Sequence, residues 1–205
     1  MAMAMDCLSP TRETEHTRLP AWPSPPRTPP RLRSIFFGAE ADPPAKLHDY
    51  LFLGSQRSAQ DKEVLRGMGI THVLNVAHEI ECYHPECFEY LHCEIEDGGM
   101  DDSIIPCFQE ATDFVRRARA VEGRVLVHCM MGINRSATVA MAVLMNLEGL
   151  TLQEAFEHTR VRRRCVSPFI GNRQKIAVWE VQTRGVSTLE EWLPSECGGP
   201  ATSRF

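Results

Sequence analysis

The sequence predicts an α/β fold in which helices flank a central mixed β-sheet. Three observations lead to this class. Short β-branched or apolar segments alternate along the chain with longer segments whose apolar residues recur at helical spacing. Glycines and capping residues separate the two kinds of segment. One loop between a predicted strand and a predicted helix carries a cysteine, a glycine and an arginine, which together suggest chemistry rather than packing.

The first predicted elements are a strand and a short helix. LHDYLFLGS (47–55) is rich in apolar and aromatic residues and ends in a Gly-Ser pair, as a strand does. Ser58 is expected to cap the next helix, with Asp61 three residues on, and the helix covers residues 59–68 before Gly69 stops it.

Three further segments are predicted strands. ITHVLNVA (70–77) and RVLVHC (124–129) are short apolar runs typical of buried strands. FEYLHCEIED (88–97) alternates Leu91, Cys93 and Ile95 with polar residues and leads into an acidic loop.

The remaining periodic segments are predicted helices. Residues 103–123 carry apolar side chains at helical spacing and end at a glycine, whereas residues 136–149 are apolar nearly all round and therefore central. TLQE (151–154) forms a capping box for a helix up to residue 164, and residues 172–184 form a last amphipathic helix.

The bulk composition bounds the class of protein. The 205 residues are 43% hydrophobic and 24% charged, which is typical of a soluble chain with one domain and a tail. A net charge of −5 argues against nucleic acid as a partner. No apolar run approaches the roughly 20 residues of a membrane span, and the chain begins without the apolar stretch of a secretory signal. We therefore expect no membrane partner, a cytoplasmic and also nuclear location, and eight cysteines that remain thiols.

Proline is concentrated at the start of the chain. Residues 1–44 hold nine of the fourteen prolines, and such a segment cannot form regular elements or bury much surface. We predict a disordered proline-rich tail, whose functional alternative is a ligand for a proline-binding domain. Residues 45–184 form the predicted folded domain, and residues 185–205 form a C-terminal extension.

The loop 129–135 has the residues needed to hold an anion over a sulfur nucleophile. Its backbone N–H groups converge on a helix N-terminus, where the helix dipole favours negative charge and the thiolate form of Cys129. Arg135 offers a planar fork for two phosphate oxygens, and Gly132 lets the backbone bend. Ser136 can donate a hydrogen bond to the sulfur. The alternative for a lone cysteine is a small buried apolar residue, but this combination favours a site for a tetrahedral dianion.

The motif HCMMGINRS resembles the active-site loop of the cysteine-dependent protein tyrosine phosphatase superfamily, in its dual-specificity branch. YLFLGS, GITHVLNVA, FEYLHCEIED and RVLVHCMMGINRSATVAMAVLM recur in the branch's order, so the similarity covers about residues 46–182. The resemblance implies a tyrosine-phosphatase-like fold with the phosphate-binding loop between a strand and a helix. It also implies phosphomonoester hydrolysis without a metal or cofactor.

The resemblance also implies roles for single residues. Cys129 is the expected nucleophile, Arg135 the phosphate clamp, and Ser136 the hydroxyl that assists release of the thiolate. His128 is expected to tune the thiol through hydrogen bonds, and Arg164 to line a second anion pocket. The expected substrate-binding residues are Met130, Met131, Gly132, Ile133, Asn134, Arg135 and Arg164.

A general acid is required because a serine or tyrosine oxyanion is a poor leaving group unless it is protonated. Asp97 matches the family's acid, and Gly98 and Gly99 after it suit a mobile loop that closes over substrate. Asp101 and Asp102 are simpler to explain as a solvated start of the next helix. The other candidates in this loop are Glu94 and Glu96.

Two features depart from the family pattern or offer an alternative. The family often has an asparagine where VSPFIGNRQ has Phe169, so the support of the loop is open, with Asn172 as a substitute. A window rich in cysteine and histidine invites a zinc interpretation, but its loose spacing favours no metal. This window contains His78, Cys82, His84, Cys87, His92 and Cys93.

These observations predict a small, atypical dual-specificity phosphatase. Its expected reaction is hydrolysis of phosphotyrosine and phosphoserine/threonine in phosphorylated proteins through a phosphocysteine intermediate. One alternative is a phosphoinositide, nucleotide or RNA 5′-phosphate as substrate. Another is a weakly active phosphoprotein-binding scaffold.

Overall fold

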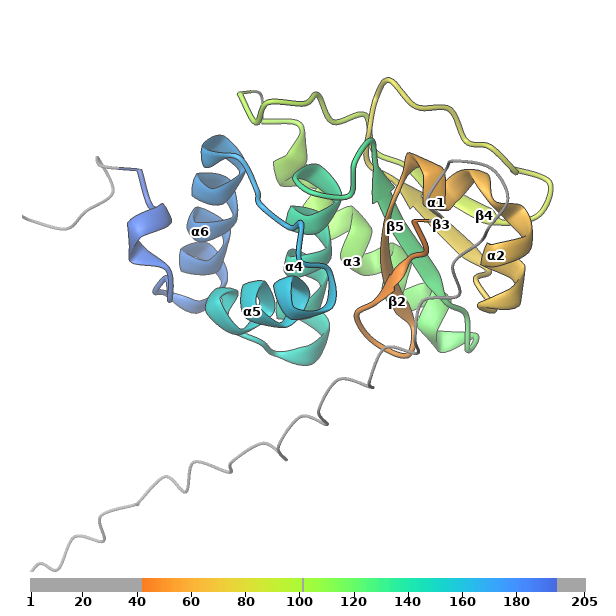
Figure 1. The fold of residues 1–205 in the computed structure, drawn as a ribbon. Coiled ribbons are helices and arrows are strands. Elements are labelled where there is room, and N and C mark those ends of the chain that lie inside the picture. The colour runs from red at the N-terminus through yellow and green to blue at the C-terminus, as the bar shows by residue number, and fades with distance from the viewer. Residues whose placement is uncertain (1–41, 101, 195–205) are drawn as a thin grey trace, which may run out of the picture. The chain divides into compact units, whose positions relative to one another are not determined.

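The computed structural model describes residues 42–100 and 102–194. A five-stranded sheet has the order β1-β2-β5-β3-β4, in which β1 pairs antiparallel and the other neighbours pair parallel (Figure 1). The predicted mixed sheet is therefore confirmed. The strands are β1 (Ala45–Lys46), β2 (Leu51–Ser55), β3 (His72–Asn75), β4 (Glu89–His92) and β5 (Val125–Cys129). The predictions for residues 1–41, for Asp101 and for residues 195–205 fall outside the described residues.

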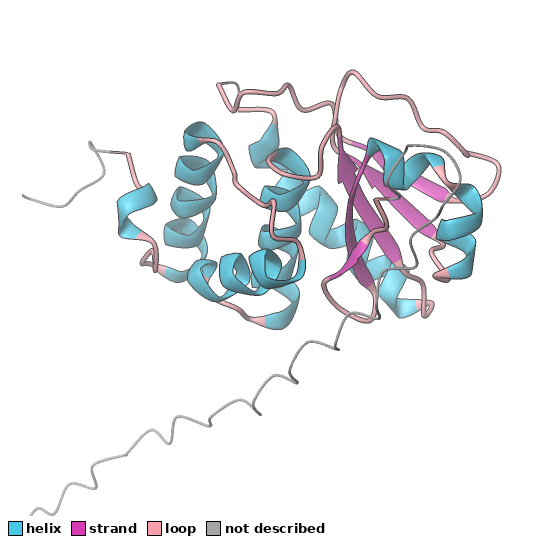
Figure 2. Ribbon diagram, viewed as in Figure 1, coloured by secondary structure: helices cyan, strands magenta, loops and turns pink. Residues whose placement is uncertain are grey.

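Helices surround the strands, and α1 and α2 lie on the other side of the strands from α4, α5 and α6 (Figure 2). The predicted long helices are confirmed, with small shifts at their ends. The helices of the described residues are α1 (Gln56–Gln60), α2 (Lys62–Gly67), α3 (Ile104–Ala120), α4 (Arg135–Glu148), α5 (Leu152–Arg162), α6 (Ile170–Arg184) and the short 3₁₀ helix η1 (Glu190–Trp192).

Both faces of the sheet are buried, each in its own core. Successive side chains of a strand point to opposite faces. Leu51 and Leu53 of β2 therefore join the large core that also contains side chains of α3, α4 and α6, whereas Phe52 joins a smaller core with side chains of α1 and α2. The same alternation places Leu74 in the large core and Val73 in the small one. Parallel strands covered on both faces account for the near-continuous apolar runs in the sequence.

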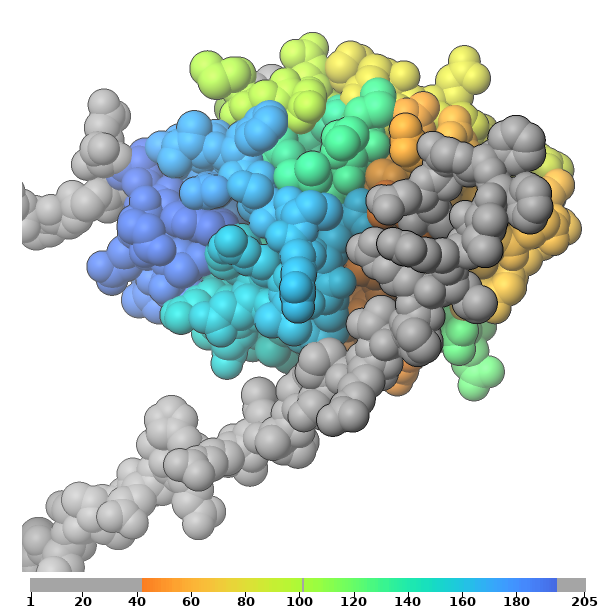
Figure 3. Space-filling model, in the orientation of Figure 1, coloured from red at the N-terminus to blue at the C-terminus, as the bar shows by residue number. Residues whose placement is uncertain are grey.

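Helix α4 is the centre of the large core. Its residues from Arg135 to Met145 are all buried, as its apolar character predicted. The green segment of the chain fills the space between the blue helices and the orange and yellow segments in the space-filling view (Figure 3). Because α4 is fixed on all sides, its first turn is a rigid base for the loop that precedes it.

The prediction of one helix over residues 59–68, capped by Ser58, is wrong. Ser55 is the N-cap of α1, and Ser58 is its partner in a reciprocal capping box. Asp61 then breaks the segment and caps α2 by accepting a hydrogen bond from Val64 N at 3.0 Å. Gly69, with φ of +70°, follows the helix end as predicted.

The described part of the predicted C-terminal extension packs against the folded domain. Trp192 is buried, and its ring centroid lies 5.0 Å from that of Phe156. The Glu180 carboxylate accepts hydrogen bonds from Ser187 Oγ and Thr188 N.

Among the described residues, none of the helices is both long and apolar enough to span a bilayer.

Candidate active site

The candidate site lies at the carboxyl ends of β5 and its parallel neighbours. Cys129 ends β5, and the register pairs it with Ser55, the last residue of β2. A loop then leads directly into α4, whose first residue is Arg135. In open sheets with parallel strands, ligands bind outside these carboxyl ends, and the N-terminus of a helix favours an anion there.

The loop brings the sulfur, a hydroxyl and a buried cation together. Cys129 is 2% exposed, and its Sγ lies 3.1 Å from Ser136 Oγ. The Arg135 side chain is 1% exposed. Gly132 has φ of +68°, and a Cβ there would lie 2.5 Å from the Gly54 carbonyl oxygen, so the bend requires glycine.

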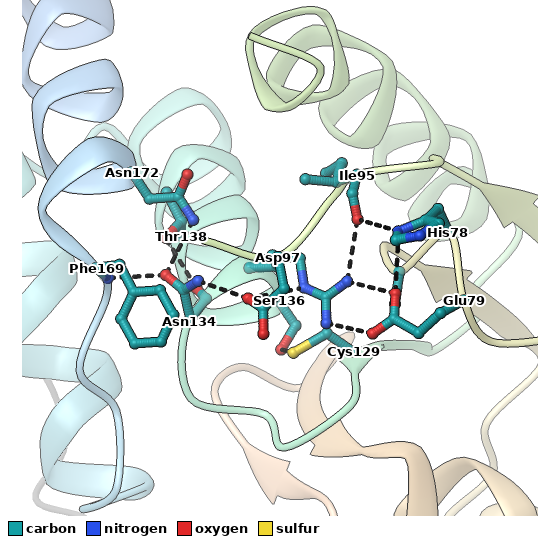
Figure 4. Close-up of polar contacts among 12 residues, drawn as sticks. His78, Glu79, Ile95, Asp97, Cys129, Asn134, Ser136, Thr138, Phe169 and Asn172 are labelled. Carbon is teal, nitrogen blue, oxygen red and sulfur yellow. Dashed lines mark hydrogen bonds and ion pairs between the residues drawn. The ribbon is translucent and has the colours of Figure 1, made fainter. Parts of the chain in front are cut away.

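Arg135 is held by a carboxylate that sequence reasoning missed. Its Nη1 and Nη2 donate to the two carboxylate oxygens of Glu79 at 2.7 and 2.5 Å, and Nη1 also donates to the Ile95 carbonyl oxygen at 3.0 Å (Figure 4). The Nε–H has no hydrogen-bond partner among the described residues. Since a guanidinium has five N–H donors, Nε–H and one Nη2–H remain on one side as a fork for two oxygens of an anion.

Glu79 is partly exposed, with 29% of its side chain accessible. The Arg135 guanidinium holds the pKa of the Glu79 carboxyl below its ordinary value of 4.5, against the opposing effect of burial. The pair therefore stabilises the fold above about pH 4.5, and this contribution is lost as the pH falls through the lowered pKa of Glu79.

Glu79→Gln should lower the free energy of unfolding at neutral pH by on the order of 2 kcal/mol, because it leaves Arg135 buried with a weaker partner. Denaturant unfolding of both proteins at several pH values measures this loss. The difference should shrink as the pH falls below 4.5, where wild-type Glu79 itself becomes protonated. Exposed Glu81 provides the matched control, Glu81→Gln. A difference that persists undiminished at pH 3 would contradict the pairing.

Asp97 follows β4 and reaches the loop. Its Oδ1 accepts a hydrogen bond from Asn134 Nδ2 at 3.0 Å and lies 3.4 Å from Arg135 Nε, while 54% of its side chain remains exposed. Asp102 instead pairs with Lys175 at 3.6 Å, away from the loop. Among the acidic candidates that the structure describes, Asp97 alone contacts the cysteine loop.

His128 does not behave as the sequence analysis expected. Its ring is fully buried, and within the described chain neither ring nitrogen forms a hydrogen bond, so the ring does not bond the Cys129 sulfur. Burial lowers the pKa of His128 to about 4. The ring is therefore neutral at neutral pH and is buried next to Cys129 at the end of β5.

Arg163 contacts the loop, whereas its neighbour Arg164 is the residue expected to line a second anion pocket. Arg163 Nε donates to the Gly132 carbonyl oxygen at 2.9 Å, and Nη2 donates to that of Met131 at 3.0 Å. Asp42 holds the same guanidinium through two further bonds of 3.0 and 3.1 Å. Arg164 is exposed and makes no hydrogen bond or ion pair with the described residues.

The other predicted loop residues divide into exposed and buried ones. Met131 is 61% exposed at the surface, and Met130 is partly buried against the core. Ile133 accepts a backbone hydrogen bond from Ser167 at 3.0 Å, and Asn134 is buried.

The window rich in cysteine and histidine does not converge on one point. His84 Nε2 lies 2.9 Å from the Gln60 carbonyl oxygen and His92 Nε2 lies 2.9 Å from that of Ala77, so the two rings have separate neighbours. Within the described ranges, no three or more residues of the metal-ligating types come close enough to hold an ion. Cys93 is buried, with its sulfur 4.0 Å from Glu110 Oε2.

A cysteine at a strand end, a glycine-bent loop and a buried arginine in the first turn of the next helix define the site of a cysteine-dependent phosphatase. Comparison with protein families agrees with this class. Residues 51–182 match the family described as dual specificity phosphatase, catalytic domain. The chain belongs to this family.

Individual phosphatases are similar to the chain in sequence. The chain is 35% identical over 129 residues to Protein phosphatase Slingshot of Drosophila melanogaster, which is 63% of this chain and 12% of that protein. It is 37% identical over 128 residues to Dual specificity protein phosphatase 1 of Arabidopsis thaliana, which is 62% of this chain and 64% of that protein. The match therefore spans less than two thirds of either relative.

Solved structures share the fold. Human DUSP28 has a TM-score of 0.66 with 27% sequence identity, over 69% of this chain and 95% of that one. The human tyrosine phosphatase-like serine/threonine/tyrosine-interacting protein has a TM-score of 0.64 with 30% identity, over 69% and 98% of the two chains. The tyrosine-phosphatase-like fold expected from the sequence is confirmed.

Proposed function

We propose that this chain is a protein phosphatase that hydrolyses phosphotyrosine and phosphoserine/threonine through a phosphocysteine intermediate. The observation that carries the proposal is the convergence of three groups on one loop. Cys129 Sγ lies beside a hydroxyl, Arg135 Nε has no hydrogen-bond partner among the described residues, and Asp97 lies 3.4 Å from that Nε. Family membership supports the same reaction.

The first step transfers the phosphoryl group to sulfur. The Cys129 thiolate attacks phosphorus in line, so an S–P bond forms while the bond from phosphorus to the substrate oxygen breaks. Asp97 gives its proton to that departing oxygen. The loop N–H groups and the Arg135 fork hold the non-bridging oxygens and stabilise their charge in the transition state.

The second step releases phosphate. Asp97, now a carboxylate, takes a proton from a water molecule whose oxygen attacks phosphorus, and the S–P bond breaks. Ser136 Oγ, at 3.1 Å from Sγ, donates a hydrogen bond to the thiolate as it leaves. The products are inorganic phosphate and the enzyme in its starting state.

The surroundings of the loop favour a protein substrate over a lipid or nucleotide. Met131, Met100 and Phe169 are exposed apolar side chains from the loop and from the two segments bonded to it through Asn134. The cysteine loop carries no basic side chain besides the buried Arg135. A substrate with several phosphates would require more cationic groups than this.

A substrate panel tests the proposal. The full chain is assayed with excess chelator on phosphotyrosine and phosphothreonine peptides, a phosphoinositide, a nucleotide and a 5′-phosphorylated RNA. Turnover of the two peptides is expected, with kcat/KM at least about tenfold higher than for the other substrates, because a mismatched site leaves polar groups unpaired. A preference for the lipid or the RNA would overturn the substrate class. Peptide binding without turnover would support the scaffold alternative.

A further inference from the structure

We infer that Asn134 and Asn172 are positioning residues that hold Asp97 in its place as the general acid. The inference rests on the proposed function, because it concerns the acid of that same reaction. It assigns to Asn134 a role different from the substrate binding expected of it. It also accounts for the departure from the family pattern at Phe169.

Both the nitrogen and the oxygen of the Asn134 side-chain amide form hydrogen bonds (Figure 4). Its Nδ2 donates to Asp97 Oδ1 at 3.0 Å, and its Oδ1 accepts from Phe169 N at 2.8 Å and from Asn172 Nδ2 at 2.9 Å. The backbone N–H of Phe169 can only donate, so the atom facing it must be the oxygen of Asn134. The orientation of the amide is thereby fixed, and Nδ2 must face Asp97.

The N-terminus of α6 holds the acid loop at a second point, Gly99. Lys175 Nζ donates to the Gly99 carbonyl oxygen at 2.7 Å, and a Cβ on Gly171 would lie 2.0 Å from that oxygen. Gly99 has φ of +72°, and a Cβ there would meet Asn172 Oδ1 at 2.9 Å. Close backbone contact at two glycines means that the loop is already seated on α6 in this structure.

This arrangement selects which oxygen of Asp97 carries the proton. Asn134 Nδ2 donates to Oδ1 and the Arg135 Nε–H lies 3.4 Å from the same oxygen, so Oδ1 faces two donors, which disfavours a proton on Oδ1 and favours one on Oδ2. Oδ2 is then the atom that serves the leaving group. Because Phe169 N and Asn172 Nδ2 both donate to Asn134 Oδ1, the N-terminus of α6 fixes the amide of Asn134 and, through it, the orientation of the acid.

Asn134→Ala and Asn172→Ala test the inference on two substrates. A phosphotyrosine peptide needs a proton for its leaving group, whereas an aryl phosphate with a strongly acidic phenol does not. Asn134→Ala should lower kcat on the peptide by roughly ten- to a hundredfold and change kcat on the activated substrate far less. Asn172→Ala should show the same pattern with a smaller loss. The basic limb of the pH profile should weaken in both variants.

A double-mutant cycle separates an effect through Asp97 from an effect on the loop. In an Asp97→Asn background, Asn134→Ala should cause no further loss on the peptide, because the proton it helps to place is gone. Vanadate affinity of each variant reports that the loop is still folded. Thr138→Val is the matched control, since Thr138 Oγ1 bonds the backbone oxygen of Asn134 at 2.8 Å instead of its side chain. It should not discriminate between the two substrates.

Equal losses on both substrates, or a full additional loss on top of Asp97→Asn, would show that Asn134 only shapes the loop and would overturn the inference. If Asn134→Ala does not bind vanadate, its loop is no longer folded. The inference then stands or falls on Asn172→Ala, judged by the same comparison of the two substrates and the same double-mutant cycle. A wild-type chain inactive on both substrates would refute the proposed function and this inference with it.

Discussion

Cys129→Ser is expected to abolish turnover of every phosphomonoester, a loss of at least about 10⁴-fold that is well within the acceleration an enzyme provides for such a reaction. A serine hydroxyl is a much weaker nucleophile than a cysteine thiolate, so the variant lacks a group able to attack phosphorus. The substitution is nearly isosteric at a site that is 2% exposed, so the fold should persist. Initial rates with a phosphotyrosine peptide measure the effect.

Vanadate binding to the variant distinguishes a lost nucleophile from a lost site. The loop N–H groups and Arg135 should still bind the oxyanion with Cys129→Ser, since neither depends on the sulfur. Cys165→Ser, at an exposed cysteine outside the loop, should retain wild-type rates. If Cys129→Ser keeps more than a trace of activity that the chelator does not remove, another residue is the nucleophile.

Asp97→Asn should lower kcat on a phosphotyrosine peptide by about 10²–10⁴-fold, the usual contribution of general acid catalysis. Asparagine can still accept the hydrogen bond from Asn134 Nδ2, so the side chain should keep its place and lose only its proton. On an aryl phosphate with an acidic phenol the loss should be much smaller. The basic limb of the wild-type pH profile should flatten in the variant.

Asp101→Asn and Asp102→Asn control for the position of the acid along its loop. Asp102 pairs with Lys175 instead of reaching the cysteine loop, so its replacement should leave both rates near those of wild type. A leaving-group-dependent loss in either control, with none in Asp97→Asn, would mean that the acid is a different residue of this loop. The mechanism at Cys129 and Arg135 would survive that result.

The regular elements could be predicted because their signals are local. The apolar run of β5 and the capping box of Thr151 and Glu154 depend on residues near one another in sequence, and both are found. The error at Ser58 is also local. Ser55 and Ser58 cap each other reciprocally, so composition alone cannot tell which of the two precedes the helix.

The partners of the cysteine loop could not be predicted, because they arise from contacts between distant segments. Glu79 reaches Arg135 because parallel β3 and β5 end at the same edge of the sheet. The sequence left the support of the loop open at Phe169 and Asn172. In the structure, the backbone N–H of Phe169 and the side-chain amide of Asn172 both donate to Asn134 Oδ1 of the loop.

The salt bridge between Asp42 and Arg163 constrains the length of the chain ahead of the sheet. β1 is held in register by the pairing of Ala45 with Leu53, so the distance from Ala45 back to Asp42 is set by the residues between them. One residue more or fewer there would displace the carboxylate by about 3.3–3.6 Å, beyond hydrogen-bond reach of the guanidinium. Arg163 would then hold the Gly132 and Met131 carbonyls without its counter-ion. Residues 43–44 should therefore accept substitution far more readily than insertion or deletion.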